Sequence, residues 1–188
     1  MIDNNMLYYS RILCRTYDLI EERGETKLSQ STKFLVEASI KNCGIATVII
    51  NALINYFTFV KPDGAAGISS TVAIPAFMAV VIGCALICPL FGGLILKGLK
   101  TDGVSFGTKD SHALGKFVPN SMLPGVLVIA AFTSVLFWFI PNALIGAAGI
   151  AFALPRMAWV ITIGVYSGIV AAFAAYFGIM RAYYAKQK

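Results

Sequence analysis

Two asparagines and a threonine are the polar side chains in this sequence whose spacing best fits a binding site. Asn51, Asn55 and Thr58 stand four and three residues apart within an apolar stretch, so a helix places them on one face. Their amide and hydroxyl groups donate and accept hydrogen bonds, which suits recognition of a neutral or weakly polar solute. Hydrogen bonding to a neighbouring helix, as part of packing, is the competing interpretation.

A later apolar stretch offers two more hydroxyl groups. Tyr166 lies between Gly164 and Gly168, and these small neighbours leave room for its ring to face a cavity. Ser167 follows directly, although serine often bonds to a carbonyl of its own helix. We expect five residues to line a cavity: Asn51, Asn55, Thr58, Tyr166 and Ser167.

Acid–base and metal chemistry are not indicated. No Asp, Glu, Lys or Arg lies in the interior of the four apolar stretches defined below, and His112 is the only histidine. A lone histidine without nearby cysteines is no metal-ligating cluster, and no phosphate-binding glycine motif is present. The sequence therefore predicts no enzyme, no catalytic residue, no metal site and no cofactor.

Small residues recur at every fourth position in two stretches. In lipid, helices associate through close packing of such residues, because there is little hydrophobic force between them. We expect the two helices that carry these rows to pack on each other, with contact to a second copy of the chain as the alternative. The rows are Cys84, Cys88 and Gly92, and then Gly164, Gly168 and Ala172.

The overall composition indicates that these residues lie in a membrane protein. The chain is 58% hydrophobic and 13% charged, with a mean hydropathy of +0.77; soluble domains have roughly 45–50% apolar and about 25% charged residues. We predict a multi-pass protein of the cell membrane that contacts membrane lipids. The net charge of +6 reflects basic residues in the loops and does not indicate nucleic-acid binding.

Four apolar stretches approach the roughly 20 residues that a membrane-spanning helix needs. The predicted fold class is all-α, a four-helix transmembrane bundle over residues 42–188. Residues 1–41 form a predicted cytoplasmic N-terminal segment with an amphipathic helix at 7–23. The predicted spans are Cys43–Val60, Val72–Leu96, Met122–Ile140 and Met157–Met180.

Basic residues predict the orientation of the bundle. Of the 15 Lys and Arg residues, 13 precede the first span, lie in the middle loop or follow the last span. Because basic residues favour the cytoplasmic side, we expect both termini and the middle loop in the cytoplasm.

An internal repeat divides the chain into two hairpins. The sequence Gly-Ala-Ala-Gly-Ile occurs at Gly64–Ile68 and at Gly146–Ile150, with matching helix ends before it and prolines after it. The repeat units are about 26–100 and about 108–188. Since both units begin on the cytoplasmic side, they have parallel topology, related by a pseudo-two-fold axis along the membrane normal.

Three local features carry further expectations. The apolar stretch Asn142–Leu154 is too short to span, so it is either an interfacial element or a re-entrant one. Pro89 lies inside the second span and predicts a kink there. Residues 31–40 are expected to form a second short helix that leads into the first span.

One repeat unit resembles a known kind of protein. Its first helix ends in Asn-Ala-Leu-Ile-Asn-Tyr-Phe-Thr-Phe, and its second, proline-containing helix ends in Leu-Lys-Gly-Leu-Lys. Over residues 26–188 the chain is similar to uncharacterised bacterial two-helix membrane hairpin proteins, some of them tandem and loosely labelled permeases. The resemblance implies membrane insertion and assigns no functional residues.

Two functional hypotheses follow. The first is a small permease or channel-like protein for a neutral or weakly polar solute. Since four helices seldom enclose a path alone, it implies a homo-oligomer. The alternative is a non-transporting membrane module that binds a lipid or a partner membrane protein through its small-residue faces and its N-terminal segment.

Overall fold

The computed structural model describes residues 32–60, 67–98 and 115–186, and the predicted amphipathic helix at 7–23 lies outside them. Four helices in this part of the chain are long and apolar enough to cross a membrane, which confirms the prediction of four candidate spans. Each is longer than the sequence pattern indicated. They are Thr32–Val60, Ser70–Gly98, Met122–Ala147 and Arg156–Ala185.

The first helix is continuous from Thr32 to Val60. It includes the π-helical segments η1 (Ile40–Gly44) and η2 (Tyr56–Val60), which flank α2 (Ile45–Asn55). From Thr32 on, the expected short helix leads into the first span, and the π turns of η1 join the two without a break.

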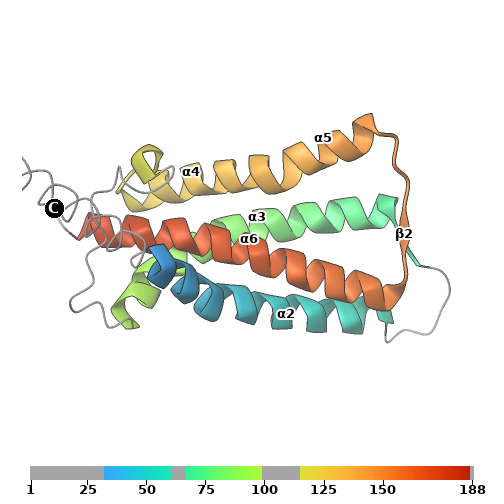
Figure 1. Cartoon of the computed structure of the whole chain (residues 1–188), viewed down its shortest axis with the longest axis horizontal. Helices are drawn as coiled ribbons and strands as arrows, with labels where there is room; N and C mark the ends of the chain where they lie inside the picture. Colours follow the sequence, from blue (N-terminus) through green and yellow to red (C-terminus); the bar gives the residue numbers. More distant parts are fainter. Residues whose placement is uncertain (1–31, 61–66, 99–114, 187–188) are drawn as a thin grey trace, which may run out of the picture.

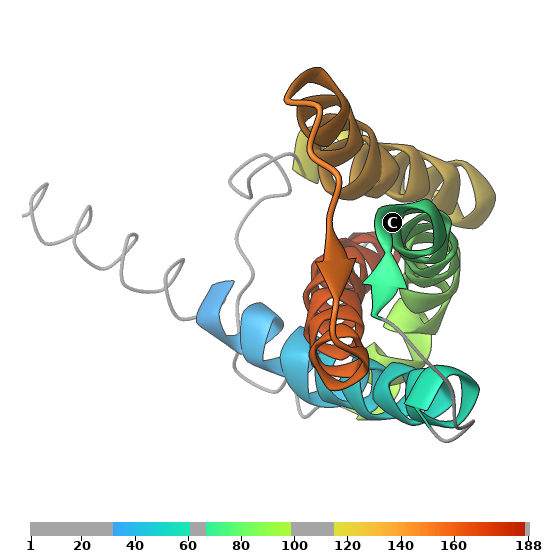
Figure 2. The ribbon, with the colours of Figure 1, turned by 90° about the vertical axis from the view of Figure 1, so that its right-hand side faces the viewer.

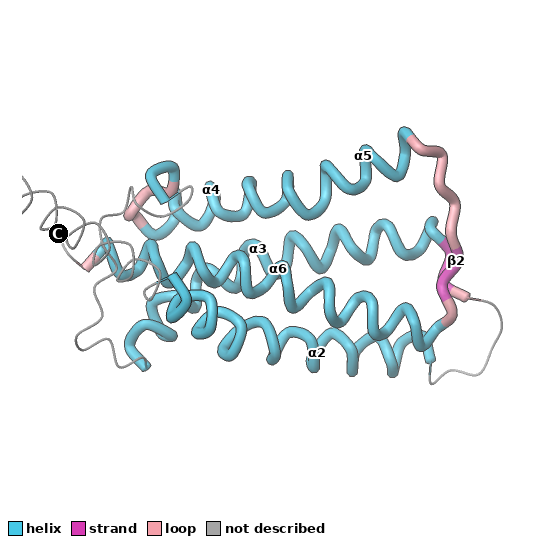
Figure 3. Tube along the Cα trace, viewed as in Figure 1, coloured by secondary structure: helices cyan, strands magenta, loops and turns pink. Residues whose placement is uncertain are grey.

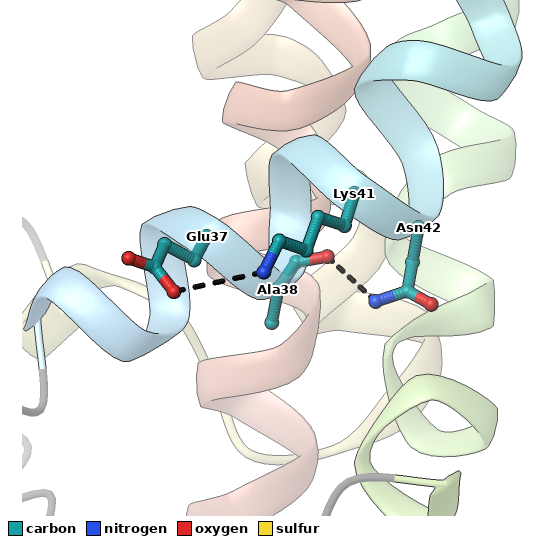
Figure 4. Close-up of polar contacts among 4 residues, drawn as sticks. All are labelled: Glu37, Ala38, Lys41 and Asn42. Carbon is teal, nitrogen blue, oxygen red and sulfur yellow. Dashed lines mark hydrogen bonds and ion pairs between the residues drawn. The ribbon is translucent and has the colours of Figure 1, made fainter.

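Local side-chain bonds support this helix where it is most polar (Figure 4). The Lys41 ammonium lies 3.9 Å from the Glu37 carboxylate, a spacing that adds a few tenths of a kcal/mol in helices, about 0.2–0.5 kcal/mol. The Asn42 amide donates to the Ala38 carbonyl oxygen at 2.8 Å. The polar groups are thus satisfied within the helix itself.

The third helix also passes through a π-helical segment. It consists of α4 (Met122–Ser134), η5 (Val135–Phe139) and α5 (Ile140–Ala147). The first half of Asn142–Leu154 ends the third helix, and its interfacial or re-entrant position stays a prediction. The wider turns of η5 precede Pro141 and accommodate its missing N–H donor.

A short β-ribbon joins the segments that directly precede α3 and α6. β1 (Ile68–Ser69) pairs antiparallel with β2 (Ala153–Leu154), and Ile68 lies opposite Leu154. A methyl group built on Gly67 would lie 2.4 Å from the Leu154 carbonyl oxygen, so only glycine allows this approach. The strands lie at the end of the bundle opposite the C-terminus (Figure 3).

The four helices are not equivalent in the bundle. α3 (Ser70–Gly98) and α6 (Arg156–Ala185) share the most extensive contact. α2 packs mainly on α6, and α4 packs mainly on α3 and also contacts α6 (Figure 2). We call the end with the start of α4 and the end of α6 the terminal end, and the end with the strands the hairpin end (Figure 1).

Glycine brings the backbones of α3 and α6 together. A methyl group on Gly92 would lie 2.2 Å from the Gly178 carbonyl carbon, and one on Gly178 would lie 2.6 Å from Pro89 Cα. α3 stays helical through Pro89. The proline therefore lies in the tightest helix crossing of the described bundle.

The second small-residue row has a different neighbour from the one expected. Methyl groups on Gly164 and Gly168 would meet Ala52 and Val48 of α2, at 3.3 and 2.3 Å. The expectation that α3 and α6 pack on each other is confirmed, but α6 has two packed faces and this row lies on the face that meets α2. The other face of α6 meets α3, where Cys84 Sγ lies 3.9 Å from the Ser167 carbonyl oxygen.

The Gly92 contact predicts the outcome of a matched pair of substitutions. Gly92→Ala should lower the free energy of unfolding by about 1–3 kcal/mol, because the added methyl overpacks the α3–α6 crossing. Gly93→Ala meets no atom within 4 Å and should change it by less than about 0.5 kcal/mol. Unfolding by SDS titration measures both, and equal effects would contradict the packing assigned to Gly92.

Candidate functional site

Asn55 is buried and closed off by a tryptophan. Its side chain is 7% exposed, and Oδ1 accepts a hydrogen bond of 2.9 Å from Trp159 Nε1. Its amide donates to the Asn51 carbonyl oxygen at 2.8 Å. Trp159 is fully buried and lies edge-on to Phe59 and Phe77, with ring centroids 6.2 and 5.2 Å away. This cluster joins α2, η2, α3 and α6.

The neighbouring polar residues bond to their own helix. The Asn51 amide donates to the Thr47 carbonyl oxygen at 3.2 Å. The exposed Thr58 hydroxyl donates to the Ile54 carbonyl oxygen at 2.8 Å. Such bonds satisfy polar groups that would be costly to leave without a partner in an apolar medium.

Tyr166 and Ser167 lie apart from the asparagines. The Tyr166 hydroxyl donates to the Phe137 carbonyl oxygen, and its ring packs edge-on against Phe77 at 5.0 Å. Tyr166 also lines a groove of about 180 Å³ beside Phe137, Asn142 and Phe152. Ser167 is fully buried and donates to the Gly164 carbonyl oxygen at 2.7 Å.

The five residues expected to line a cavity do not converge on one in the described part of the chain. Four of them donate to a backbone carbonyl three or four residues earlier in the same helix. Tyr166 donates instead to a carbonyl of the third helix. Sequence reasoning missed Trp159, the partner of Asn55. A tryptophan within a span gave a signal, since a buried indole N–H needs an acceptor.

An apolar groove of about 640 Å³ runs along the outside of the bundle between the first helix and α6. We call it the α2–α6 groove. Gly44, Gly168 and Ala172 lie at its base, where the two helices approach each other. Its walls include Val36, Ile40, Ile45, Val165, Ile169 and Phe173.

A second apolar groove, of about 260 Å³, lies between the start of the third helix and α6. We call it the α4–α6 groove. Phe177 lines both this groove and the α2–α6 groove. Its other lining residues are Phe117, Val118, Val128, Ile129 and Phe132.

Three buried free cysteines form a thiol cluster. Cys88 contacts the thiols of both Cys43 and Cys84, so the first helix contributes a member that the sequence pattern did not indicate. No group of metal-ligating side chains with suitable geometry occurs among the described residues. The cluster lies in the apolar core, where thiols pack as small hydrophobic groups.

Comparison with known protein families, curated proteins and solved structures found no match to this chain. The resemblance to bacterial membrane hairpin proteins stays a prediction. The described residues thus offer three features that bear on function. These are the grooves, the closed polar clusters and the charges at the ends of the bundle.

A double-mutant cycle tests the Asn55–Trp159 contact. Asn55→Ala and Trp159→Phe should couple by about 0.6–1.7 kcal/mol in unfolding free energy, the range for interhelical hydrogen bonds in membranes. Asn51→Ala combined with Trp159→Phe is the matched control and should show no coupling, because the Asn51 side chain bonds to Thr47. Additive effects for the first pair would contradict a direct bond.

Proposed function

We propose that this protein is a non-transporting, non-catalytic membrane module that holds a lipid acyl chain in the α2–α6 groove. The groove itself is the observation that carries the proposal. Its volume of about 640 Å³ lies within the range of small-molecule sites, roughly 300–1,000 Å³. Its position on the outside of the bundle makes it accessible from the lipid.

The lining of the groove favours hydrocarbon over a polar ligand. Ser39 is one of its few polar members, and its hydroxyl already donates to the Leu35 carbonyl oxygen at 2.7 Å. Val165 and Ile169 are about half exposed, so they present apolar surface to whatever fills the groove. A flexible acyl chain can follow such a surface without any polar contact.

A partner transmembrane helix fits this surface less well. Helix association in lipid depends on small residues that let backbones approach closely. Gly164 and Gly168 meet α2 of the same chain, so this row is already used inside the bundle. The exposed positions along the groove are large aliphatic side chains instead.

The interior gives little support to a solute path. Gly92 and Gly178 bring α3 and α6 into backbone contact toward the terminal end, and Asn55 is closed off by Trp159. Permeation of a neutral solute, and the homo-oligomer that it implies, remain predictions. We favour the lipid-binding hypothesis because it uses the groove that the described residues form.

The repeat and the orientation belong to the same proposal. α2 packs on α6, and α4 packs on α3. In each case the first helix of one hairpin packs on the second helix of the other. A pseudo-two-fold axis along the membrane normal accounts for that pattern. Lysines gather at the terminal end, which supports placing it in the cytoplasm of a cell-membrane protein; they are Lys33, Lys41, Lys97, Lys116 and Lys186.

Filling the groove should weaken lipid binding. Ile169→Trp places a large ring in the α2–α6 groove, and displacing about two CH₂ groups should weaken acyl-chain affinity roughly tenfold. Ile161→Trp is the matched control, since Ile161 is also exposed on α6 and does not line this groove. Native mass spectrometry of the purified chain with phosphatidylcholine measures the retained lipid.

Equal lipid retention by both tryptophan variants and the wild type would contradict the proposal. A flux assay separates it from transport. Liposomes that contain the protein should take up glycerol no faster than protein-free liposomes, as followed by light scattering. A protein-dependent flux that Asn55→Ala abolishes would establish a solute path and overturn the non-transporting assignment.

A further inference from the structure

A buried arginine near the end of α6 lacks a hydrogen-bond partner for one of its donors. Arg181 is only 6% exposed, and its Nε has no partner among the described residues. A charged group is costly to bury without compensation. Neither groove lined by Phe177 includes Arg181, so the proposed acyl-chain site does not explain it.

The Arg181 side chain crosses the first turn of α4. A methyl group built on Gly125 would lie 2.5 Å from Arg181 Cδ and equally close to the Pro119 carbonyl oxygen. Glycine at this position therefore leaves the space through which the arginine reaches the helix start. Asn120, next to Pro119, has a second buried and unpartnered atom, Oδ1.

Among the described residues, the surroundings of Arg181 are electropositive. The N-cap residue of α4, Ser121, makes no capping hydrogen bond with its side chain, and the first N–H groups of a helix have no acceptor within it. Lys116 lies in η4 (Gly115–Phe117), which contacts α6. The only acidic residue among those described is Glu37, and it pairs with Lys41.

We propose that Arg181 binds the phosphate of an anionic phospholipid whose acyl chain lies in the α4–α6 groove. The two parts of this site adjoin each other. Phe177 lies one helical turn before Arg181, and Val118 precedes Pro119; both line the groove. A guanidinium with a free donor binds a phosphate oxygen strongly.

The depth of Arg181 suits a headgroup. α6 has 30 residues and is about 45 Å long, so its ends extend past the roughly 30 Å of hydrocarbon. Arg181 lies close to the C-terminal end of this helix. The phosphate of a lipid would thus meet the guanidinium while its chain follows the helix inward.

The two unpartnered atoms indicate which kind of headgroup fits the site. Arg181 Nε is a donor and complements a phosphate oxygen, whereas Asn120 Oδ1 is an acceptor and complements a hydroxyl group. Phosphatidylglycerol carries both groups. This site is separate from the α2–α6 groove, and its occupation does not depend on the function proposed for that groove.

The test compares phosphatidylglycerol with phosphatidylcholine of the same acyl chains, bound to the full-length chain and measured by native mass spectrometry. The wild type should prefer phosphatidylglycerol. Arg181→Gln should weaken phosphatidylglycerol binding about fivefold and leave phosphatidylcholine binding unchanged. Arg156→Gln, at the hairpin end of α6, is the matched control and should change neither.

A second variant keeps the test informative if Arg181→Gln does not fold. Val128→Trp fills the α4–α6 groove without altering the charge and should weaken the binding of phosphatidylglycerol. An unchanged affinity in this variant would overturn the proposal, as would equal affinities of the wild type for the two lipids. Ile169→Trp should not affect the preference, which separates this site from the α2–α6 groove.

Two other partners for Arg181 would also overturn the proposal. Inorganic phosphate that stabilises the wild type but not Arg181→Gln against heat, without any lipid preference, would identify a site for a free anion. Asp102 and Asp110 lie outside the described residues. Both can be changed to Asn. If the preference for phosphatidylglycerol appears only in that variant, a carboxylate of the chain itself pairs with the Arg181 guanidinium.

Discussion

The backbone contact between α3 and α6 is the constraint on which the bundle depends. Lipid provides little hydrophobic force between helices, so close packing has to hold them together. Gly92 and Gly178 allow this by removing the side chains that would otherwise separate the two backbones. Once α3 and α6 form the centre, α2 and α4 can only pack on their outer sides.

The low polarity of the surroundings explains how the polar residues are used. A polar group without a partner is costly in an apolar medium, and most of these side chains bond to a carbonyl of their own helix. Asn55 and Trp159 satisfy each other across two helices. Arg181 and Asn120 at the terminal end, and Thr133 within α4, each keep a buried polar atom without a hydrogen bond, and Arg181 is the charged one among them.

The grooves follow from the same packing. Helices that cross tightly at glycines diverge away from the crossing, which leaves concave apolar surface on the outside. The α2–α6 groove lies beside the contact of Gly44 with Gly168. This proposed lipid site is thus a consequence of where small residues occur along α6 and the first helix.

The sequence by itself determined the four spans, because the thickness of the hydrocarbon core sets a length that an apolar stretch must reach. It also identified the small-residue faces, since their spacing follows the helical period. Only the tertiary structure decided which neighbour each face meets: Gly168 of α6 contacts Val48 of α2, and Trp159 bonds to Asn55 from far along the chain. Periodicity defines a face of one helix, but the partner depends on how all the helices pack.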